Sequence, residues 1–144
     1  MAQAAPWHAR LTGGGLKVGL MLAGRKTWKA HYDRAVPSDA LTALAGVPGI
    51  ALHSLQKDPP LTPSGGAITD LAPELVDFAD TAAAITALDL VISVDTAVVH
   101  LAGALGKPVW IMLPRFADWR WLVERADGPW YPTARLFRQT TPDD

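Results

Sequence analysis

The 144-residue sequence predicts an α/β domain, a Rossmann-like parallel sheet flanked by helices. Short and almost continuously apolar runs recur along the chain, as expected for strands that are covered on both faces. Segments with helix-capping residues alternate with these runs, which is the pattern of βαβ units. Hydrophobic residues make up 49% of the chain and charged residues 19%, so a sizeable core can form.

The predicted strands share a short apolar run bounded by turn residues, and they are 16–23, 50–55, 67–71, 90–94 and 109–113. The predicted helices share a capping residue or a breaker at an end, and they are Ser38–Ala45, Thr81–Leu88, Thr96–Leu105 and Trp119–Arg125. Asp80 is the expected cap of the second helix. The proline-rich and glycine-rich stretch 58–66 is expected to be a loop.

One domain is expected, with short flanking segments. Residues 1–15, broken by Pro6 and a run of three glycines, are interpreted as a linker-like lead-in. Residues 16–140 form the predicted Rossmann-like domain, and 141–144 form a tail.

Composition excludes several classes of protein. The net charge of −1 offers no basic field for nucleic acid, and the absence of cysteine excludes disulfides and thiolate metal sites. The four histidines lack metal-ligand spacing, so no metal site is expected. No apolar run approaches the roughly 20 residues of a membrane-spanning helix, and no signal peptide is evident. We therefore expect a cytoplasmic protein without nucleic-acid partners or membrane insertion.

The turn after the strand 90–94 is the most informative candidate site. Ligands of parallel sheets bind outside the carboxyl ends of the strands, and Asp95, Thr96 and Ala97 follow this strand directly. The first turn of a helix presents unpaired N–H groups that favour a phosphate, and His100 lies one turn further on the same face as Thr96. The alternative is that Asp95 or Thr96 only caps the helix and His100 is a core residue.

Two further strand ends carry polar residues. Gly24, Arg25 and Lys26 follow the first strand and could bring two cations to the same crevice, although a solvated turn explains them equally well. Gln56 and Lys57 follow the second strand and give a weaker signal.

Other motifs are absent or uninformative. The sequence has no G-x-G-x-x-G and no Walker loop, and no nucleophile elbow surrounds Ser93, which argues against a hydrolase. The tryptophans of 118–121 and 128–132 could stack on a sugar or a base, although packing explains most of them.

Most of the chain resembles a known family. The stretch 77–110, the segments 17–24 and 54–57, and the tail 118–139 look like the C-terminal, donor-binding domain of bacterial GT-B glycosyltransferases. This domain is found after tetratricopeptide repeats, and it is similar to the heptosyltransferases of glycosyltransferase family 9. The resemblance implies one half of a GT-B fold, with a nucleoside-diphosphate sugar as donor substrate and no cofactor or metal.

The resemblance also implies roles for particular residues. Thr96 and Ala97 would donate to the diphosphate, His100 would lie beside it, and Asp95 would orient the turn. The Gly24–Lys26 loop would approach from the facing side, and Gln56 would lie near the nucleoside. The donor-binding residues expected on this basis are Gly24, Arg25, Lys26, Gln56, Asp95, Thr96, Ala97 and His100. No catalytic residue is assigned.

Two departures qualify these expectations. The family pattern after the first strand reads Trp-Ala-Gly-Asn, whereas this chain has Leu22-Ala-Gly-Arg25. Trp7–Leu11 resembles the segment that links two domains, so an acceptor domain is expected in a missing N-terminal half or a partner chain. The first hypothesis is the donor half of a hexosyl- or heptosyltransferase, inactive without its acceptor domain. The alternative is a degenerate, non-catalytic binding or structural module.

Overall fold

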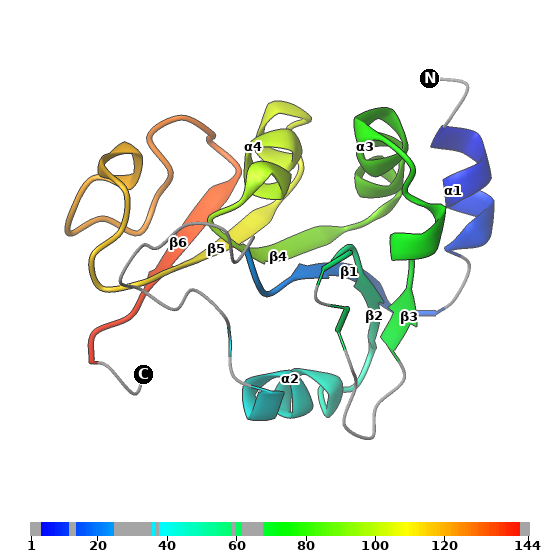
Figure 1. The fold of residues 1–144 in the computed structure, drawn as a ribbon, viewed down its shortest axis with the longest axis horizontal. Helices are drawn as coiled ribbons and strands as arrows, with labels where there is room; N and C mark the ends of the chain where they lie inside the picture. Colours follow the sequence, from blue (N-terminus) through cyan, green and yellow to red (C-terminus); the bar gives the residue numbers. More distant parts are fainter. Residues whose placement is uncertain are drawn as a thin grey trace.

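The computed structural model describes residues 4–11, 14–24, 36, 38–58, 60–61 and 68–141. Helices and strands alternate along most of this chain (Figure 1). In chain order they are α1 (Ala4–Arg10), β1 (Leu16–Met21), α2 (Ser38–Ala45), β2 (Ile50–Ser54), β3 (Ile68–Asp70), η1 (Ala72–Glu74), α3 (Phe78–Ala87), β4 (Leu90–Val94), α4 (Ala97–Ala104), β5 (Val109–Leu113), η2 (Trp119–Trp121) and β6 (Ala134–Arg138). The predicted loop 58–66 lies mostly outside the described residues.

Six strands form one parallel sheet in the order β3-β2-β1-β4-β5-β6, which confirms the predicted α/β class. The chain winds from β1 outward to β3, then returns to the other side of β1 and continues to β6. Such a reversal opens a crevice at the carboxyl ends of the two central strands. The fold therefore places the ends of β1 and β4 at a topological switch point.

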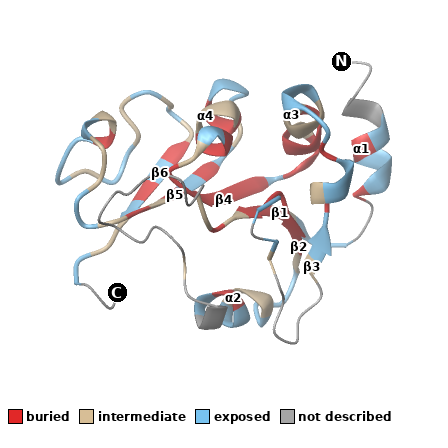
Figure 2. Ribbon diagram, viewed as in Figure 1, coloured by how far each residue is buried: buried red, intermediate tan, exposed pale blue. Residues whose placement is uncertain are grey.

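The sheet separates two apolar cores. Helices α1, α3 and α4 cover one face, and α2 covers part of the other (Figure 1). Buried residues concentrate in the strands and on the sides of the helices that face them (Figure 2). Strand β4 is buried along its whole length, because it lies between β1 and β5 with packed side chains on both faces. The continuous apolar run of this strand is thus explained by its central position.

Helix α3 begins at Phe78 rather than at Thr81, because its cap is Asp77 and not Asp80. The Asp77 carboxylate accepts a hydrogen bond from the Asp80 amide at 2.9 Å. The Asp80 carboxylate accepts in turn from the amides of Asp77 at 3.4 Å and Val76 at 3.1 Å. This reciprocal arrangement is a capping box, in which Asp80 is the third helical residue.

Helix α1 lies in the segment 1–15, for which the sequence predicted a linker and no helix. Pro6 lies in its first turn, where a missing N–H costs no intrahelical hydrogen bond. Trp7 and Leu11 are buried in the core beneath this helix, and Arg10 pairs with Glu74 at 2.9 Å. This part of the lead-in therefore contributes to the core of the domain.

The tail differs from the predicted helix at Trp119–Arg125. Only the short turn η2 forms, because Leu122 and Glu124 have positive φ angles of 54° and 58° that end the helical path. The chain then returns to the sheet as β6, an edge strand that sequence reasoning missed. In the described residues no helix combines the length and apolar character needed to cross a membrane.

Candidate functional site

The turn between β4 and α4 lies at the switch point of the sheet, directly after the strand that was predicted at 90–94. Thr96 is the N-cap of α4, and its extended backbone leads directly into the helix at Ala97. Its hydroxyl does not cap the helix and instead lies 3.2 Å from the hydroxyl of Ser93. The first backbone N–H groups of a helix have no intrahelical acceptor, so this end of α4 remains a donor surface. It carries the positive end of the helix dipole.

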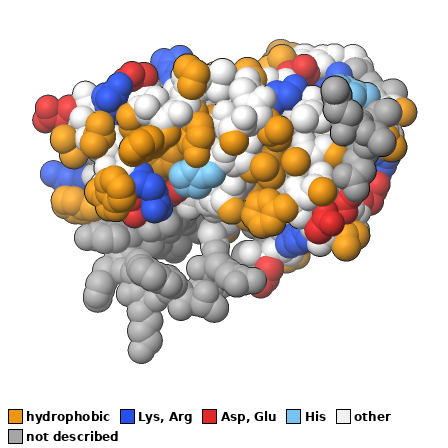
Figure 3. All heavy atoms as spheres, turned by 90° about the horizontal axis from the view of Figure 1, so that it is seen from above, with side chains coloured by type: hydrophobic (Ala, Val, Ile, Leu, Met, Phe, Trp, Pro, Cys, Tyr) orange, Lys and Arg blue, Asp and Glu red, His pale blue; other side chains and the backbone are white. Residues whose placement is uncertain are grey.

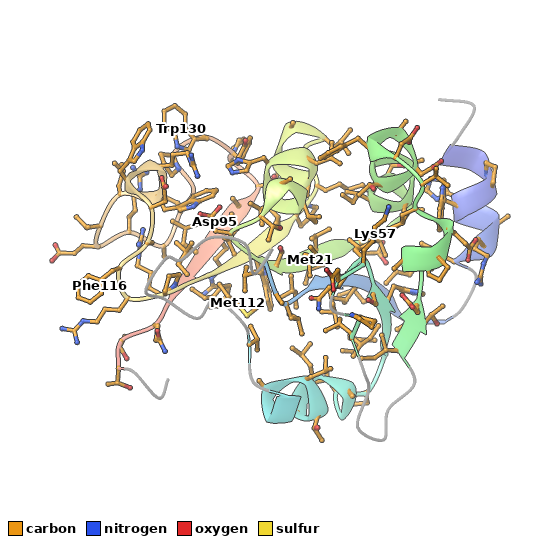
Figure 4. All side chains as sticks on the ribbon, in the orientation of Figure 1. Met21, Lys57, Asp95, Met112, Phe116 and Trp130 are labelled. Atoms are coloured by element: carbon orange, nitrogen blue, oxygen red, sulfur yellow. The ribbon has the colours of Figure 1, made fainter. Side chains whose placement is uncertain are left out.

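Asp95 and His100 lie next to each other at this turn. The Asp95 side chain is only 5% exposed, and its Oδ1 lies 3.8 Å from Nε2 of His100. The His100 side chain is 35% exposed, so it borders both the core and the crevice. Asp95 is therefore directed at His100, and His100 is accessible to a ligand. Figure 4 shows Asp95 just beyond the carboxyl end of β4.

The end of β1 lies against the same turn. A Cβ atom added to Gly24 would lie 3.9 Å from Cγ2 of Thr96, which is ordinary van der Waals contact. The structure therefore brings Gly24 and Thr96 together from two strand ends. Arg25 and Lys26, which were expected to approach the phosphates from this loop, lie outside the described residues.

Gln56 holds the end of β1 in place. It is 2% exposed, and its Oε1 accepts hydrogen bonds from the amides of Leu22 and Ala23, both at 2.9 Å. These two residues immediately precede Gly24 in the chain. Gln56 therefore holds the backbone that leads to Gly24 by means of its buried side-chain oxygen.

A shallow hollow of about 400 Å³ lies at the same edge of the sheet, beyond β1 as seen from α4. Its charged groups come from Lys57, which lies after β2, and from Asp70, the last residue of β3. Pro60, Ala72, Pro73 and Leu75 form its apolar lining. In Figure 4, Met21 at the end of β1 lies between Asp95 and Lys57. The hollow thus lies at the carboxyl ends of β2 and β3, on the side of β1 opposite to β4.

The C-terminal segment places two side chains against His100 that are not among the site residues predicted from the sequence. Tyr131 lies with its hydroxyl 2.9 Å from Nδ1 of His100, and Trp121 stacks on the imidazole with ring centroids 5.5 Å apart. A signal for the approach of Tyr131 is Gly103, because a glycine in α4 lets another segment pack closely on the helix. A Cβ atom at Gly103 would overlap the ring of Tyr131, so Tyr131 is the side chain that packs against this glycine.

The tryptophans of this segment differ in how far they are buried. Trp121 is fully buried, as packing predicts, whereas Trp119 is 73% and Trp130 57% exposed. Phe116 and Val123 are exposed in the same segment. Figure 3, which looks onto the face of α3 and α4, shows hydrophobic side chains interspersed with basic ones at this end of the molecule.

Within the described ranges, no group of three or more His, Asp or Glu side chains is arranged to hold a metal ion. The polar groups that surround the start of α4 are amides, hydroxyls, one imidazole and one buried carboxylate. The amides, hydroxyls and imidazole of this set can donate hydrogen bonds to an anion.

Comparison with known proteins identifies relatives of part of this chain. Residues 56–112 match the profile of glycosyltransferase family 9 (heptosyltransferase). This stretch, from Gln56 to Met112, includes β4, α4 and most of the candidate site.

Two longer matches cover nearly the whole chain. Protein FlbA from Caulobacter vibrioides is 33% identical over an alignment of 150 residues. The alignment spans 94% of this chain and 24% of FlbA. The chain thus spans about a quarter of the length of that curated relative. A crystal structure of a family 9 glycosyl transferase from Veillonella parvula matches with a TM-score of 0.62 at 14% identity, covering 96% of this chain and 40% of that one. This second likeness shows a shared fold.

Proposed function

We propose, from the similarity of residues 56–112 to glycosyltransferase family 9, that this protein binds a nucleoside-diphosphate sugar as a glycosyl donor. The observation that carries the proposal is the start of α4 at the switch point of the sheet. There the Thr96 side chain leaves the helix uncapped, and a partly exposed imidazole follows one turn later at His100. Backbone donors and the helix dipole at such a position favour a diphosphate.

The same groups suit the chemistry of sugar transfer. When the bond between the sugar and the diphosphate breaks, negative charge grows on the leaving phosphate oxygen. Amides at the start of α4 and an N–H of His100 would stabilise that charge without a metal ion. The side chain of Asp95 is buried against His100, so its own negative charge is directed to the imidazole.

The nucleoside would lie away from α4, toward the hollow beside Lys57 and Asp70. Gln56 would act from beneath by fixing the loop that ends at Gly24. We propose a GT-B arrangement in which the acceptor is held by a further domain or a partner chain. The chain covers 40% of the matched transferase structure, so transfer itself is proposed for that larger assembly.

Donor binding is tested by measuring thermal unfolding of the protein with ADP, GDP, CDP and UDP. A ligand that binds only the folded state at about a hundredfold excess over Kd adds about 2.7 kcal/mol to the free energy of unfolding. We expect one nucleotide to raise the melting temperature by several degrees. A cooperative transition that none of the four moves would favour the alternative, a non-catalytic module.

A charge substitution at Ala97 sharpens this test, because its side chain is exposed on the first turn of α4. Ala97→Glu places a carboxylate where the helix dipole favours it, so stability should hold or rise slightly by about 0.3–1 kcal/mol. The same carboxylate should repel a diphosphate and abolish binding. Ala97→Gln is the matched neutral control and should retain most of the affinity. Equal binding by both variants would exclude this helix end as the diphosphate site.

A further inference from the structure

The C-terminal segment holds the imidazole of His100 between two aromatic rings. Trp121 stacks on it at an interplanar angle of 20°, and Tyr131 meets it edge-on at 64° with ring centroids 5.8 Å apart. The hydroxyl of Tyr131 also lies 2.9 Å from Nδ1. Nδ1 of His100 is therefore hydrogen-bonded to a residue that lies 31 positions away in the sequence.

Both rings are themselves fixed in place. Trp121 is completely buried, so its ring is a rigid platform for the imidazole. Tyr131 packs directly on α4 at Gly103, where any side chain would overlap its ring. The tyrosine therefore reaches His100 only because α4 carries a glycine one turn after the histidine.

The surroundings of the two ring nitrogens determine which one carries the hydrogen. Nε2 faces the buried carboxylate of Asp95, whose Oδ1 is 3.8 Å away. A carboxylate can only accept, so a hydrogen on Nε2 is favoured there. Nδ1 is then unprotonated and accepts the hydroxyl hydrogen of Tyr131.

We propose that Tyr131 is a positioning residue that holds His100 with its hydrogen on Nε2, the nitrogen that faces Asp95 at the proposed diphosphate site. Tyr131 affects the binding of the diphosphate only through the imidazole of His100 and does not itself contact the diphosphate. The inference rests on the proposed function for its ligand, whereas the state of the imidazole can be measured without one.

The first experiment measures the histidine ring in the ligand-free protein by ¹⁵N–¹H NMR at alkaline pH. We expect His100 to carry its hydrogen on Nε2. In Tyr131→Phe, which removes only the hydroxyl, the Nδ1 resonance should shift because its hydrogen bond is lost. A hydrogen found on Nδ1 in the wild-type protein would overturn the proposal, since Tyr131 would then accept and Nε2 could not donate.

The second experiment is a double-mutant cycle with ADP, GDP, CDP and UDP as probes. Tyr131→Phe should weaken binding of the preferred nucleotide by about 3- to 10-fold, the range expected for one lost hydrogen bond. In a His100→Gln background the same change should alter affinity less than about 2-fold, because no imidazole remains to be positioned.

The possible results separate the two proposals. An equal loss of affinity in both backgrounds would mean that Tyr131 acts independently of His100, which overturns the inference while donor binding stands. No binding of any nucleotide by the wild-type protein would overturn the proposed function and the ligand part of this inference. The NMR measurement decides the part that concerns His100 in either case.

Discussion

Gln56 shows how a buried side chain can fix the backbone next to a candidate site. Its buried oxygen accepts from two successive backbone amides at the end of β1. Each amide would cost about 1–3 kcal/mol if it were left buried and unpaired. The loop at the end of β1 therefore depends on a polar residue that follows the neighbouring strand β2.

His53 gives the protein a predicted sensitivity to acid. It is 7% exposed in β2, and burial together with the charges of Lys17 and Arg10 lowers its pKa from 6.5. Below about pH 6.5 the unfolded chain binds a proton that the folded protein does not. The free energy of unfolding should therefore fall as the pH drops, by at most about 1.4 kcal/mol per pH unit for this group.

Urea denaturation of wild type and His53→Gln at about pH 7.5 and about pH 5 measures this contribution. The wild-type protein should lose more stability than the variant between the two pH values. His8→Gln is the control, because His8 is exposed on α1. Parallel stability losses in wild type and His53→Gln would show that His53 does not cause the sensitivity.

At the scale of the elements, the capping box of α3 fixes where that helix begins. Asp77→Ala removes the acceptor of the Asp80 amide and should lower the free energy of unfolding by about 1 kcal/mol, within the usual range of about 0.5–2 for such caps. Chemical denaturation measures the change. Asp58→Ala, at an exposed position outside helices and strands, is the control and should stay within about 0.5 kcal/mol of wild type. An unchanged stability in Asp77→Ala would contradict the role of this cap.

The C-terminal segment shows how packing overrides a local helical tendency. Trp121 is fully buried under the site, and the backbone after it passes through positive φ angles at Leu122 and Glu124. The backbone oxygen of Trp121 also accepts a short hydrogen bond from Arg138 on β6. These contacts with distant residues end η2 after one turn and return the chain to the sheet edge.

At the scale of the whole molecule, α1 is a structural part of the core. Trp7 packs in the same cluster as Ala83 and Leu88 near α3. Trp7→Ala should therefore lower the free energy of unfolding by about 3 kcal/mol or more and keep a single cooperative transition. Circular dichroism during urea denaturation measures both. His8→Ala on the exposed side of the helix is the control. A separate early transition in Trp7→Ala would mean instead that α1 unfolds independently of the sheet.

The candidate site could be predicted from sequence to the extent that it is local. Asp95, Thr96, Ala97 and His100 follow one another after a recognisable buried strand, so their placement at the start of α4 needed only the strand and helix pattern. The part contributed by Tyr131 could not be predicted, because it lies 31 residues beyond His100 and depends on how the tail packs.

The sequence by itself determined the α/β class, the strands β4 and β5 to the residue, and the turn that carries the candidate site. It did so because apolar periodicity and capping act within a few residues of chain. Only the tertiary structure decided the helix at α1, the edge strand β6, the inward-facing Gln56 and the partners of His100. Each of these depends on burial against residues distant in sequence, and the free energy of such contacts outweighs the local preferences of the chain.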